Sequence, residues 1–298
     1  MMIAQHPRKS RLVLTACRLS ASTYYYRSTL IGGQRRVRGR IKTHQTADTT
    51  GVLHDNSAIV LAMERILTQE FACYGYRAMA AVLRREGFCI NHKKLYWMMK
   101  EAALLSTGRT KRVAKRLLAQ RGKVKPTKPL EHLQMDIKYV FIVGETKWAY
   151  LLTIIDAFSR CLPAQLFARS IRANDVIALL NCHASGWKST TRIRIRTDHG
   201  SQFIANDVAL ALEKLHIEHE FTHPCVPEEN AFIESWHSIF QREVTDRYEF
   251  ETFDQAQQTI ERHRHWYQFE RVHGSLKYQT PNEFLLAYQQ NNVIQYST

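Results

Sequence analysis

The chain has 298 residues, of which 45% are hydrophobic and 23% are charged, so it can form two or more domains with a sizeable core. Its 42 Lys and Arg residues outnumber its 27 Asp and Glu residues, and the resulting charge of +15 favours a polyanionic partner over a basic enzyme without one. The sequence has no apolar stretch of about 18 residues and no apolar signal segment near its start, so it predicts neither membrane insertion nor secretion.

The first segment, residues 1–56, is predicted to be a short helical piece followed by a linker. Residues 9–27 carry two short helical patterns that resemble a small helix-turn-helix, and the second ends in three tyrosines. These tyrosines are interpreted as packing residues, with stacking on bases as the alternative. From Gly32 to Asn56 the chain is basic, then polar, with little periodicity, which is typical of a linker.

Residues 57–105 predict three helices: one capped by Ser57, a second after Tyr76 that ends at Gly87, and a third after Asn91. In the third helix an apolar stripe around Leu95 and Met99 faces inward. The opposite, basic side has the form of a DNA recognition helix, and a solvated basic face of a helical bundle is the alternative. The residues predicted to contact DNA here are His92, Lys93, Lys94 and Lys100.

Residues 106–128 form a basic segment. Nine Lys or Arg residues and no acid lie between Arg109 and Lys128, and Pro126 and Pro129 mark its end. Such a segment is usually a solvated connector. Between a DNA-binding unit and an enzymatic core it could also follow a phosphate backbone.

From Glu131 onward, strands and helices follow in an order typical of an α/β sheet. The predicted strands are 133–143, 149–156, 162–167, one around Ile193, and 217–221. The predicted helices are 174–185, one capped by Asn206, and one that carries Glu234. We expect the core to span 129–250 and a helical extension to span 251–298.

Three acidic residues in this core have unusual positions. Asp136 interrupts an apolar strand predicted to be buried on both faces, where a charge needs a partner or a metal. Asp198 closes a strand, and Glu234 projects from the polar face of its helix together with His237, Ser238 and Gln241. Taken singly, the aspartates could be turn formers and the glutamate a solvated residue.

Four sequence words surround these acids: IDAFSR at 155–160, TDHGSQF at 197–203, ENAFIESWH at 229–237 and YQFERVHGSLKYQTPNEF at 267–284. With them the chain resembles, from about Arg8 to about Tyr288, the DDE transposases of bacterial insertion sequences, which have a retroviral integrase-like core. Asp136, Asp198 and Glu234 match the first Asp, the second Asp and the Glu of that family, with thirty-five residues between the last two.

The resemblance implies a ribonuclease H-like α/β core, preceded by small all-α helix-turn-helix-like DNA-binding segments, in which the first and fourth strands lie side by side. It implies that Asp136, Asp198 and Glu234 are the catalytic residues and the ligands of two Mg²⁺ ions, for which Mn²⁺ can substitute. The implied activity is binding to the ends of a mobile element, followed by DNA cleavage and strand transfer.

The resemblance also implies partners and a place in the cell. The implied partners are double-stranded DNA at the element ends and target, further copies of the chain on DNA, and an upstream-frame product fused by frameshifting. The implied location is the cytoplasm of a bacterium. Relatives often carry Lys or Arg seven residues after the Glu, whereas this chain has Gln241, with Arg242 beside it as the predicted DNA contact. The alternatives are an idle DNA-binding regulator derived from such an element and a nuclease without strand transfer.

Several further residues are assigned structural or secondary roles. The six cysteines include no Cys-x-x-Cys pair, which favours reduced thiols. Zinc is not predicted at His216, His219, His223 and Cys225, because they lack the spacing of structural zinc sites. Asp156 is interpreted as structural, and the loop Pro224–Asn230 is expected to be mobile without DNA.

Overall fold

The computed structural model describes residues 43–105, 125–187, 192–223 and 227–295, together with Leu14 and Ser189; at 227–228 and 292–295 it describes only the backbone. Gln45–Thr298 forms one compact unit. The helical piece predicted at 9–27 and most of the basic segment 106–128 therefore lie outside the described residues. No helix within the described ranges is long and apolar enough to cross a membrane.

The predicted linker before residue 56 contains a β-hairpin, so that prediction was wrong for its last part. Strands β1 (Gln45–Ala47) and β2 (Leu53–Asp55) pair in antiparallel fashion. The Asp48 carboxylate closes the turn, since it accepts hydrogen bonds from the backbone N–H groups of Thr50 (2.9 Å) and Val52 (3.0 Å). Short polar strands with such a turn carry too little apolar alternation to be recognised by periodicity.

Three helices follow, as predicted: α4 (Asn56–Leu67), α5 (Tyr76–Arg85) and α6 (His92–Glu101). The cap of α4 is Asp55, whose carboxylate accepts from the Ser57 N–H at 2.8 Å, and not Ser57 itself. The Asn91 side chain caps α6. Their buried residues, among them Met63, Met79 and Leu95, form one apolar core.

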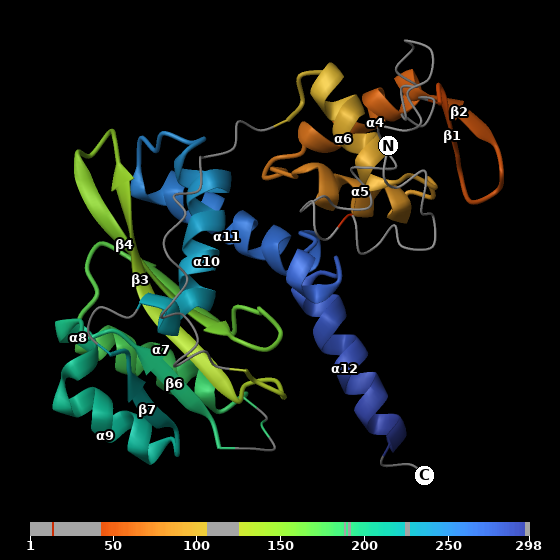
Figure 1. The fold of residues 1–298 in the computed structure, drawn as a ribbon. Helices are drawn as coiled ribbons and strands as arrows, with labels where there is room; N and C mark the ends of the chain where they lie inside the picture. The colour runs from red at the N-terminus through yellow and green to blue at the C-terminus, as the bar shows by residue number, and fades with distance from the viewer. Residues whose placement is uncertain are drawn as a thin grey trace. The chain divides into compact units, whose positions relative to one another are not determined.

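The sheet has five strands in the order β5-β4-β3-β6-β7 (Figure 1). They are β3 (His132–Ile142), β4 (Lys147–Asp156), β5 (Ala164–Ala168), β6 (Arg194–Thr197) and β7 (Glu218–Phe221). The first three pair in antiparallel fashion, whereas β6 runs parallel to β3 and β7. The predicted ribonuclease H-like core and the adjacency of its first and fourth strands are confirmed.

Helices cover both faces of the sheet. On one face, α7 (Ala173–Ala184), α8 (Ser201–Ile204) and α9 (Asn206–Lys214) pack on Leu133, Met135 and Ile195. Asn206 begins α9 but does not cap it, because Ala205 holds the cap position. The other face meets α10 (Ala231–Phe240), its π-helical continuation η3 (Gln241–Thr245), and α11 (Phe253–Phe269).

Strand β3 is buried on both faces only in its first half. His132 through Met135 are buried, whereas Tyr139 and Phe141 are 58% and 41% exposed, opposite Tyr150 and Trp148 on β4. Val140 and Ile142 remain buried beside them, so only one face of the β3–β4 ribbon is covered at this end, and periodicity alone suggested more burial than the fold provides.

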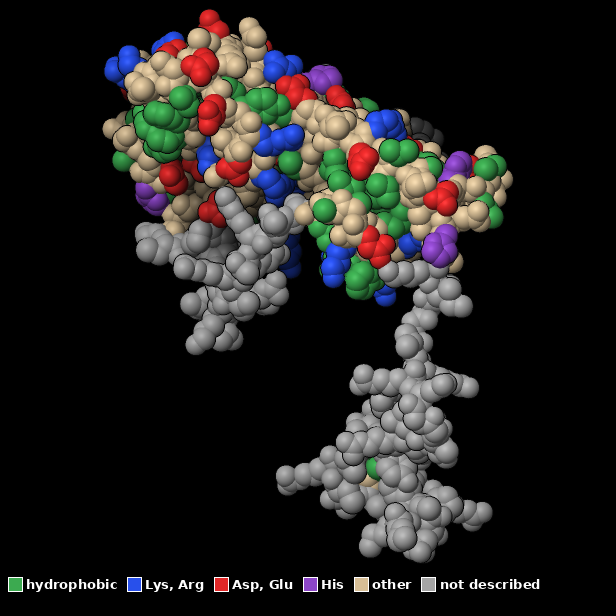
Figure 2. Space-filling view, turned by 90° about the horizontal axis from the view of Figure 1, so that it is seen from above, with side chains coloured by type: hydrophobic (Ala, Val, Ile, Leu, Met, Phe, Trp, Pro, Cys, Tyr) green, Lys and Arg blue, Asp and Glu red, His purple; other side chains and the backbone are tan. Residues whose placement is uncertain are grey.

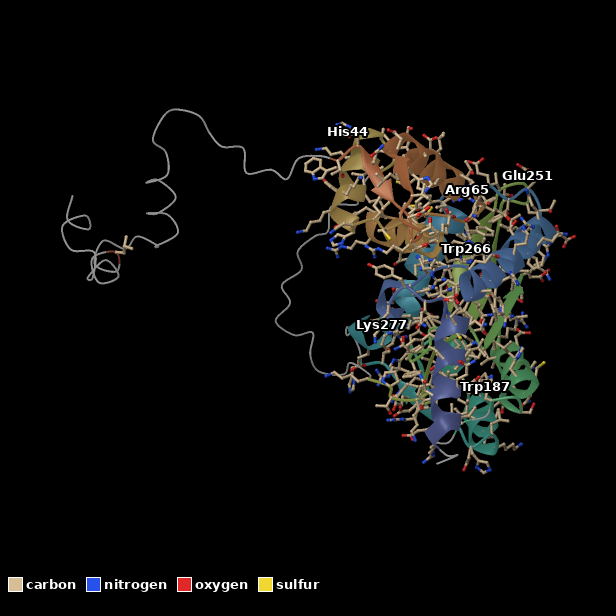
Figure 3. The ribbon with its side chains drawn as sticks, turned by 90° about the vertical axis from the view of Figure 1, so that its right-hand side faces the viewer. His44, Arg65, Trp187, Glu251, Trp266 and Lys277 are labelled. Carbon is tan, nitrogen blue, oxygen red and sulfur yellow. The ribbon has the colours of Figure 1, made fainter. Side chains whose placement is uncertain are left out.

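The α4–α6 segment packs against the C-terminal extension, which continues through η4 (Gly274–Leu276) to α12 (Pro281–Gln295). Phe71 and Tyr74 lie with ring centroids 5.8 and 6.2 Å from that of Trp266, which is labelled in Figure 3. Two ion pairs border this contact, Arg262 with Glu70 at 2.9 Å and Arg85 with Glu283 at 2.7 Å.

Candidate functional site

The pairing of β3 with β6 brings the two aspartates together. These parallel strands are in register at Gln134 and Arg196, and each aspartate lies two residues further along its strand direction. Because neighbouring strands lie about 4.8 Å apart, this register places Asp136 and Asp198 at the same level of the sheet. Asp198 follows the last residue of β6, where its Oδ1 accepts the Gly200 N–H at 2.9 Å.

A buried glutamine ties helix α10 to the same level of β3. The side-chain oxygen of Gln134 accepts the N–H groups of Phe232 and Ile233, both at 3.0 Å, and its amide donates to the Glu229 carbonyl at 2.7 Å. These bonds satisfy N–H groups that the first turn of a helix leaves without intrahelical partners. Glu234 stands in that first turn, exposed as predicted.

The charges of Asp198 and Glu234 act on Asp136. Burial, together with the charges of Asp198 and Glu234, raises the pKa of Asp136 to about 6. A hydrogen bond from the Ile137 N–H at 2.7 Å and the charge of Lys138 act in the opposite direction. Asp136 therefore lies where negative charge is concentrated and only partly offset.

Two further side chains border these acids. His237 Nδ1 lies 3.6 Å from Asp136 Oδ2, and burial together with Lys138 lowers the pKa of His237 to about 4, so this contact joins a neutral imidazole to the acid. The Lys138 ammonium donates to Gln241 Oε1 at 3.1 Å. A cation from β3 thus lies beside the glutamine that replaces the basic residue expected from the resemblance.

The donor set fits a divalent cation in chemistry and charge. Carboxylate oxygens are the ligands that Mg²⁺ prefers, and a cation would relieve the repulsion that raises the pKa of Asp136. Within the described ranges, no group of three or more His, Cys, Asp or Glu side chains is assembled closely enough to hold a metal ion. A closed set of ligands therefore requires the three carboxylates to move closer together.

Neighbouring acids have structural partners. Asp156 is buried and accepts hydrogen bonds from the N–H groups of Phe158 and Ser159 and from the Ser159 hydroxyl, which accords with the structural role predicted for it. Glu229 accepts from the backbone N–H of His223 at 2.8 Å and lies 2.9 Å from its Nδ1.

In the loop predicted to be mobile, 227–230 forms the 3-10 turn η2, and 224–226 lie outside the described residues.

The basic residues predicted on α6 do not share one face. Lys93 and Lys100 are exposed beside the half-exposed Trp97, and the Lys100 ammonium lies 5.2 Å from the centre of the Trp97 ring. Lys94 departs from the prediction: its ammonium donates to the Gln45 carbonyl at 2.6 Å and to Thr46 Oγ1 at 2.8 Å. It stabilises the hairpin, which the sequence did not reveal. His92 is half-buried.

The predicted DNA contact Arg242 lies in η3, half-exposed, with Nη2 3.5 Å from Glu243 Oε1. The surplus of positive charge lies elsewhere in the sequence: residues 1–42 and 106–124 contain 17 Lys and Arg and no acid. The rest of the chain has more acids than Lys and Arg, and both signs are interspersed over the described surface visible in Figure 2.

Sequence reasoning missed the residues that position the acids. Gln134 lies within the strand predicted at 133–143, and Arg196, which donates to the Glu229 carbonyl at 3.2 Å, lies in the strand predicted around Ile193, but neither was given a role. Polar residues inside strands are the signal that could have revealed them, because a buried amide or guanidinium has to find partners.

Family models match in the same order along the chain. An HTH-like domain covers residues 54–112, and two models of the integrase core domain cover 126–227 and 215–281. An insertion element IS476 protein of Xanthomonas euvesicatoria is 30% identical over 78% of this chain. The chain belongs to the bacterial insertion-sequence transposase family with an integrase-like core.

The match spans 66% of the length of that Xanthomonas relative. An insertion element IS407 protein of Burkholderia multivorans is 27% identical over 78% of this chain and 82% of its own length. Among solved structures, the catalytic core domain of HTLV-2 integrase, in complex with magnesium, is similar over 53% of this chain and 97% of its own, with a TM-score of 0.39 and 13% identity.

Proposed function

We propose that this chain is a transposase that binds the ends of a mobile DNA element and catalyses metal-dependent DNA cleavage and strand transfer. The observation that carries the proposal is geometric: Asp136 and Asp198 lie at one level of two adjacent parallel strands, and Gln134 ties the start of the helix that carries Glu234 to that level. Burial and the charges of Asp198 and Glu234 also raise the pKa of Asp136. Membership of a family with an integrase core supports it.

In this proposal Asp136 and Asp198 hold divalent metal jointly and Glu234 completes the coordination. When bound, two Mg²⁺ or Mn²⁺ ions supply activation of a water or 3′-hydroxyl and stabilise the leaving oxygen. The chain itself contributes placement: Gln134 fixes the start of α10, and neutral His237 borders Asp136 without competing for its charge. No nucleophilic side chain is required.

Lys138 is proposed to serve the DNA strand at this site. Its ammonium donates to Gln241, beside the three acids. There it could bind the phosphate that neighbours the cleaved one in a DNA strand. Replacement of the Gln241 contact by a phosphate contact would cost little, since the ammonium exchanges a neutral amide oxygen for an anionic oxygen.

Double-stranded DNA is proposed to bind at the exposed side of α6, through Lys93 and Lys100, and at the basic sequence segments. Arg242 is proposed as a contact closer to the acids. We further propose that the chain acts as an oligomer on DNA and that an upstream-frame product can be fused to it. The division into a 57–105 DNA-binding domain, a 129–250 core and a 251–298 extension is part of the same proposal.

The test is incubation of the purified chain with labelled duplexes that carry the ends of its own element, with Mg²⁺, with Mn²⁺ or with EDTA. We expect a nick that leaves a 3′-hydroxyl at the element end, and joined products when target DNA is added. Binding to the ends without any cleavage in either metal would instead support an idle DNA-binding regulator. Cleavage without joining would support a nuclease.

A further inference from the structure

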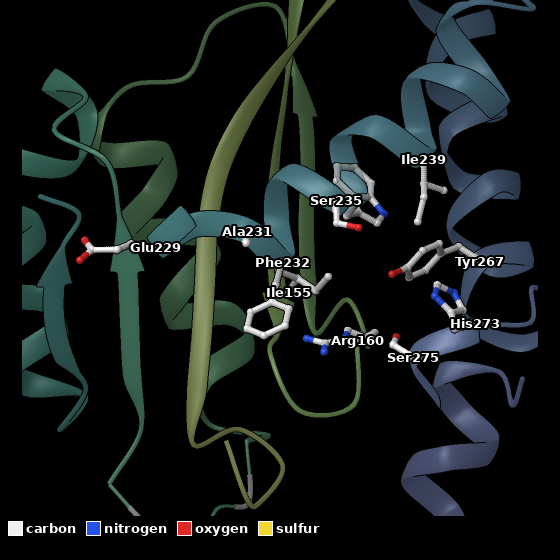
Figure 4. Close-up of a pocket in the computed structure, with 11 residues that line it drawn as sticks. Ile155, Arg160, Glu229, Ala231, Phe232, Ser235, Ile239, Tyr267, His273 and Ser275 are labelled. Atoms are coloured by element: carbon white, nitrogen blue, oxygen red, sulfur yellow. The ribbon is translucent and has the colours of Figure 1, made fainter. Parts of the chain in front are cut away.

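A cavity with a largely apolar lining and a few polar groups lies beside helix α10. It has a volume of about 360 Å³ and is formed by α10, the turn after β4 and the segment that follows α11 (Figure 4). None of the three proposed catalytic acids lines it. The residues that matter for its chemistry are Arg160, Phe232, Ser235, Trp236, Tyr267 and His273.

Arg160 brings a poorly compensated positive charge to this cavity. Its guanidinium carbon lies 3.8 Å from the centre of the Phe232 ring, and one N–H donates to the Ala157 carbonyl. No carboxylate in the described residues lies within ion-pair distance of it. Burial lowers its pKa, and the charge of Asp156, beyond ion-pair distance, acts in the opposite direction. Arg160 also has φ of +66°, a conformation that L-residues adopt at a cost, so the fold stabilises it in place.

Trp236 supplies a donor that the protein leaves unused. The side chain is buried, 1% exposed, and lines the cavity, yet its indole Nε1–H has no hydrogen-bond partner. A buried N–H without a partner loses its hydrogen bond to water and gains nothing in return, so such groups are rare unless something else satisfies them. An acceptor entering the cavity would satisfy this one.

The other polar groups favour an anion as well. Burial raises the pKa of Tyr267 and, with the nearby guanidinium groups, lowers the pKa of His273, so the first keeps its phenolic proton and the second is uncharged. Ser235 and Ser275 add hydroxyl groups. Glu229 is the only acid in the lining, and its carboxylate is engaged by His223 and turned away from Tyr267 and His273 in Figure 4.

We propose that this cavity is a phosphate subsite for a DNA strand, with Arg160 and the Trp236 indole N–H as its donors. The inference rests on the proposed function. Ser235 follows Glu234 directly, so the rim of the cavity is one residue from the acid cluster. A strand bound at the acids can therefore place a neighbouring nucleotide here, and the volume suits a nucleotide unit better than a single ion.

The test follows the Trp236 indole N–H by ¹H–¹⁵N NMR of the full chain, in EDTA so that no metal is involved. The chain has five tryptophans, and Trp236→Phe identifies the signal while keeping an aromatic ring. The probes are a 5′-phosphorylated trithymidylate, unphosphorylated thymidine, inorganic phosphate and an acetylated peptide with a free C-terminal carboxylate. We expect a saturable shift with the trithymidylate, a weaker one with phosphate, and none with thymidine.

Arg160→Gln should weaken trithymidylate binding about 10- to 100-fold, measured by the indole shift. Trp236→Phe should weaken it about 2- to 10-fold, measured by calorimetry because this variant lacks the indole signal; these losses are typical of charged and neutral hydrogen bonds. The matched control is Arg264→Gln, which removes another half-buried arginine whose guanidinium donates to the Leu162 carbonyl outside the cavity. It should leave binding unchanged. Trp236→Phe decides the matter if Arg160→Gln fails to fold.

Equal affinity for phosphate and trithymidylate, tighter binding of the peptide, or equal losses in Arg264→Gln would overturn the proposal. The subsite is also measured in Asp136→Asn, where cleavage is expected to be absent. Normal binding there supports the subsite independently of the activity. Cleavage by the wild type without any indole response would overturn the subsite alone.

Discussion

Glu234 and Glu243 lie nine residues apart on one continuous helical segment, α10 and η3, and their surroundings are opposite. Glu234 is exposed and shares its site with Asp136 and Asp198. Glu243 is fully buried, with Arg271 Nε at 3.0 Å, His263 Nε2 at 3.3 Å and Arg242 Nη2 at 3.5 Å. One glutamate is grouped with acids and the other with bases.

The difference separates a chemical role from a structural one. A carboxylate surrounded by cations is already neutralised and links parts of the fold, here η3 to α11 and the segment after it. A carboxylate placed among other carboxylates stores repulsion that only an external cation can remove. Nine residues at about 100° each rotate the chain by half a turn, which is why neighbouring glutamates on one helix meet such different environments.

The largest expected effect is on chemistry. Asp136→Asn, Asp198→Asn and Glu234→Gln keep the side-chain volume but remove the charge, so each should reduce cleavage and strand transfer at least about a thousandfold, equivalent to roughly 4 kcal/mol. DNA-end binding should persist, and circular dichroism should show an intact fold. Glu229→Gln is the control, because His223 engages its carboxylate. Near wild-type cleavage in any of the three variants would remove that residue from the proposed site.

The next effect is on stability. Glu243→Gln and Arg271→Met each leave a buried charge without its partner, so each should lower the free energy of unfolding by about 3–5 kcal/mol. Urea unfolding measures this directly. The double variant should lose less than the sum of the two, because neither charge is then stranded. Additive losses would show that the pair is not coupled and would weaken the contrast with Glu234.

Asp136→Asn should stabilise the chain when no metal is present. The raised pKa of about 6 means that the folded state binds the proton more tightly than the unfolded state, so wild-type stability increases as pH falls through 6 and decreases as pH rises through it. At one pKa unit per about 1.4 kcal/mol, the variant should gain about 1–3 kcal/mol at pH 7.5.

The gain should vanish below about pH 4, where the wild-type carboxyl is protonated in both states. Thermal unfolding in EDTA across this range provides the measurement. Asp156→Asn is the contrasting variant. Burial raises the pKa of Asp156 as well, but both of its oxygens accept N–H bonds, so the amide NH₂ of Asn would face a donor and the change should destabilise the chain. A gain for Asp136→Asn that did not depend on pH would contradict the electrostatic explanation.

Much of the core followed from the sequence because long apolar elements have clear periodicity. The adjacency of the first and fourth strands could not follow from periodicity, which says nothing about neighbours, and came from the resemblance. Caps were less certain: Asp55 and not Ser57 caps α4, because adjacent polar residues are equally able to do so.

The candidate site was predicted residue by residue for its acids, yet not for their supports. Gln134 was given no role in the predicted strand, and its two bonds to α10 and one to η2 join residues about a hundred positions apart. For Lys94 the sequence predicted a DNA contact but missed a contact within the protein. This lysine has the right position on a recognition helix, but its ammonium is used by a hairpin that the sequence did not predict.

The smallest expected effect is on the salt dependence of DNA binding, where Lys93 and Lys100 should differ from Lys94. Lys93→Gln and Lys100→Gln should each flatten the slope of log affinity against log salt by up to about 0.9 for duplex DNA, because each removes one cation that can neutralise a phosphate. Lys94→Gln should leave the slope unchanged and lower stability instead, since its ammonium bonds Gln45 and Thr46 inside the protein. Fluorescence anisotropy between about 50 and 200 mM salt gives the slopes. If Lys94→Gln flattened the slope as much as Lys93→Gln, the hairpin contact would not withhold this charge from DNA, and the two lysines would be equivalent.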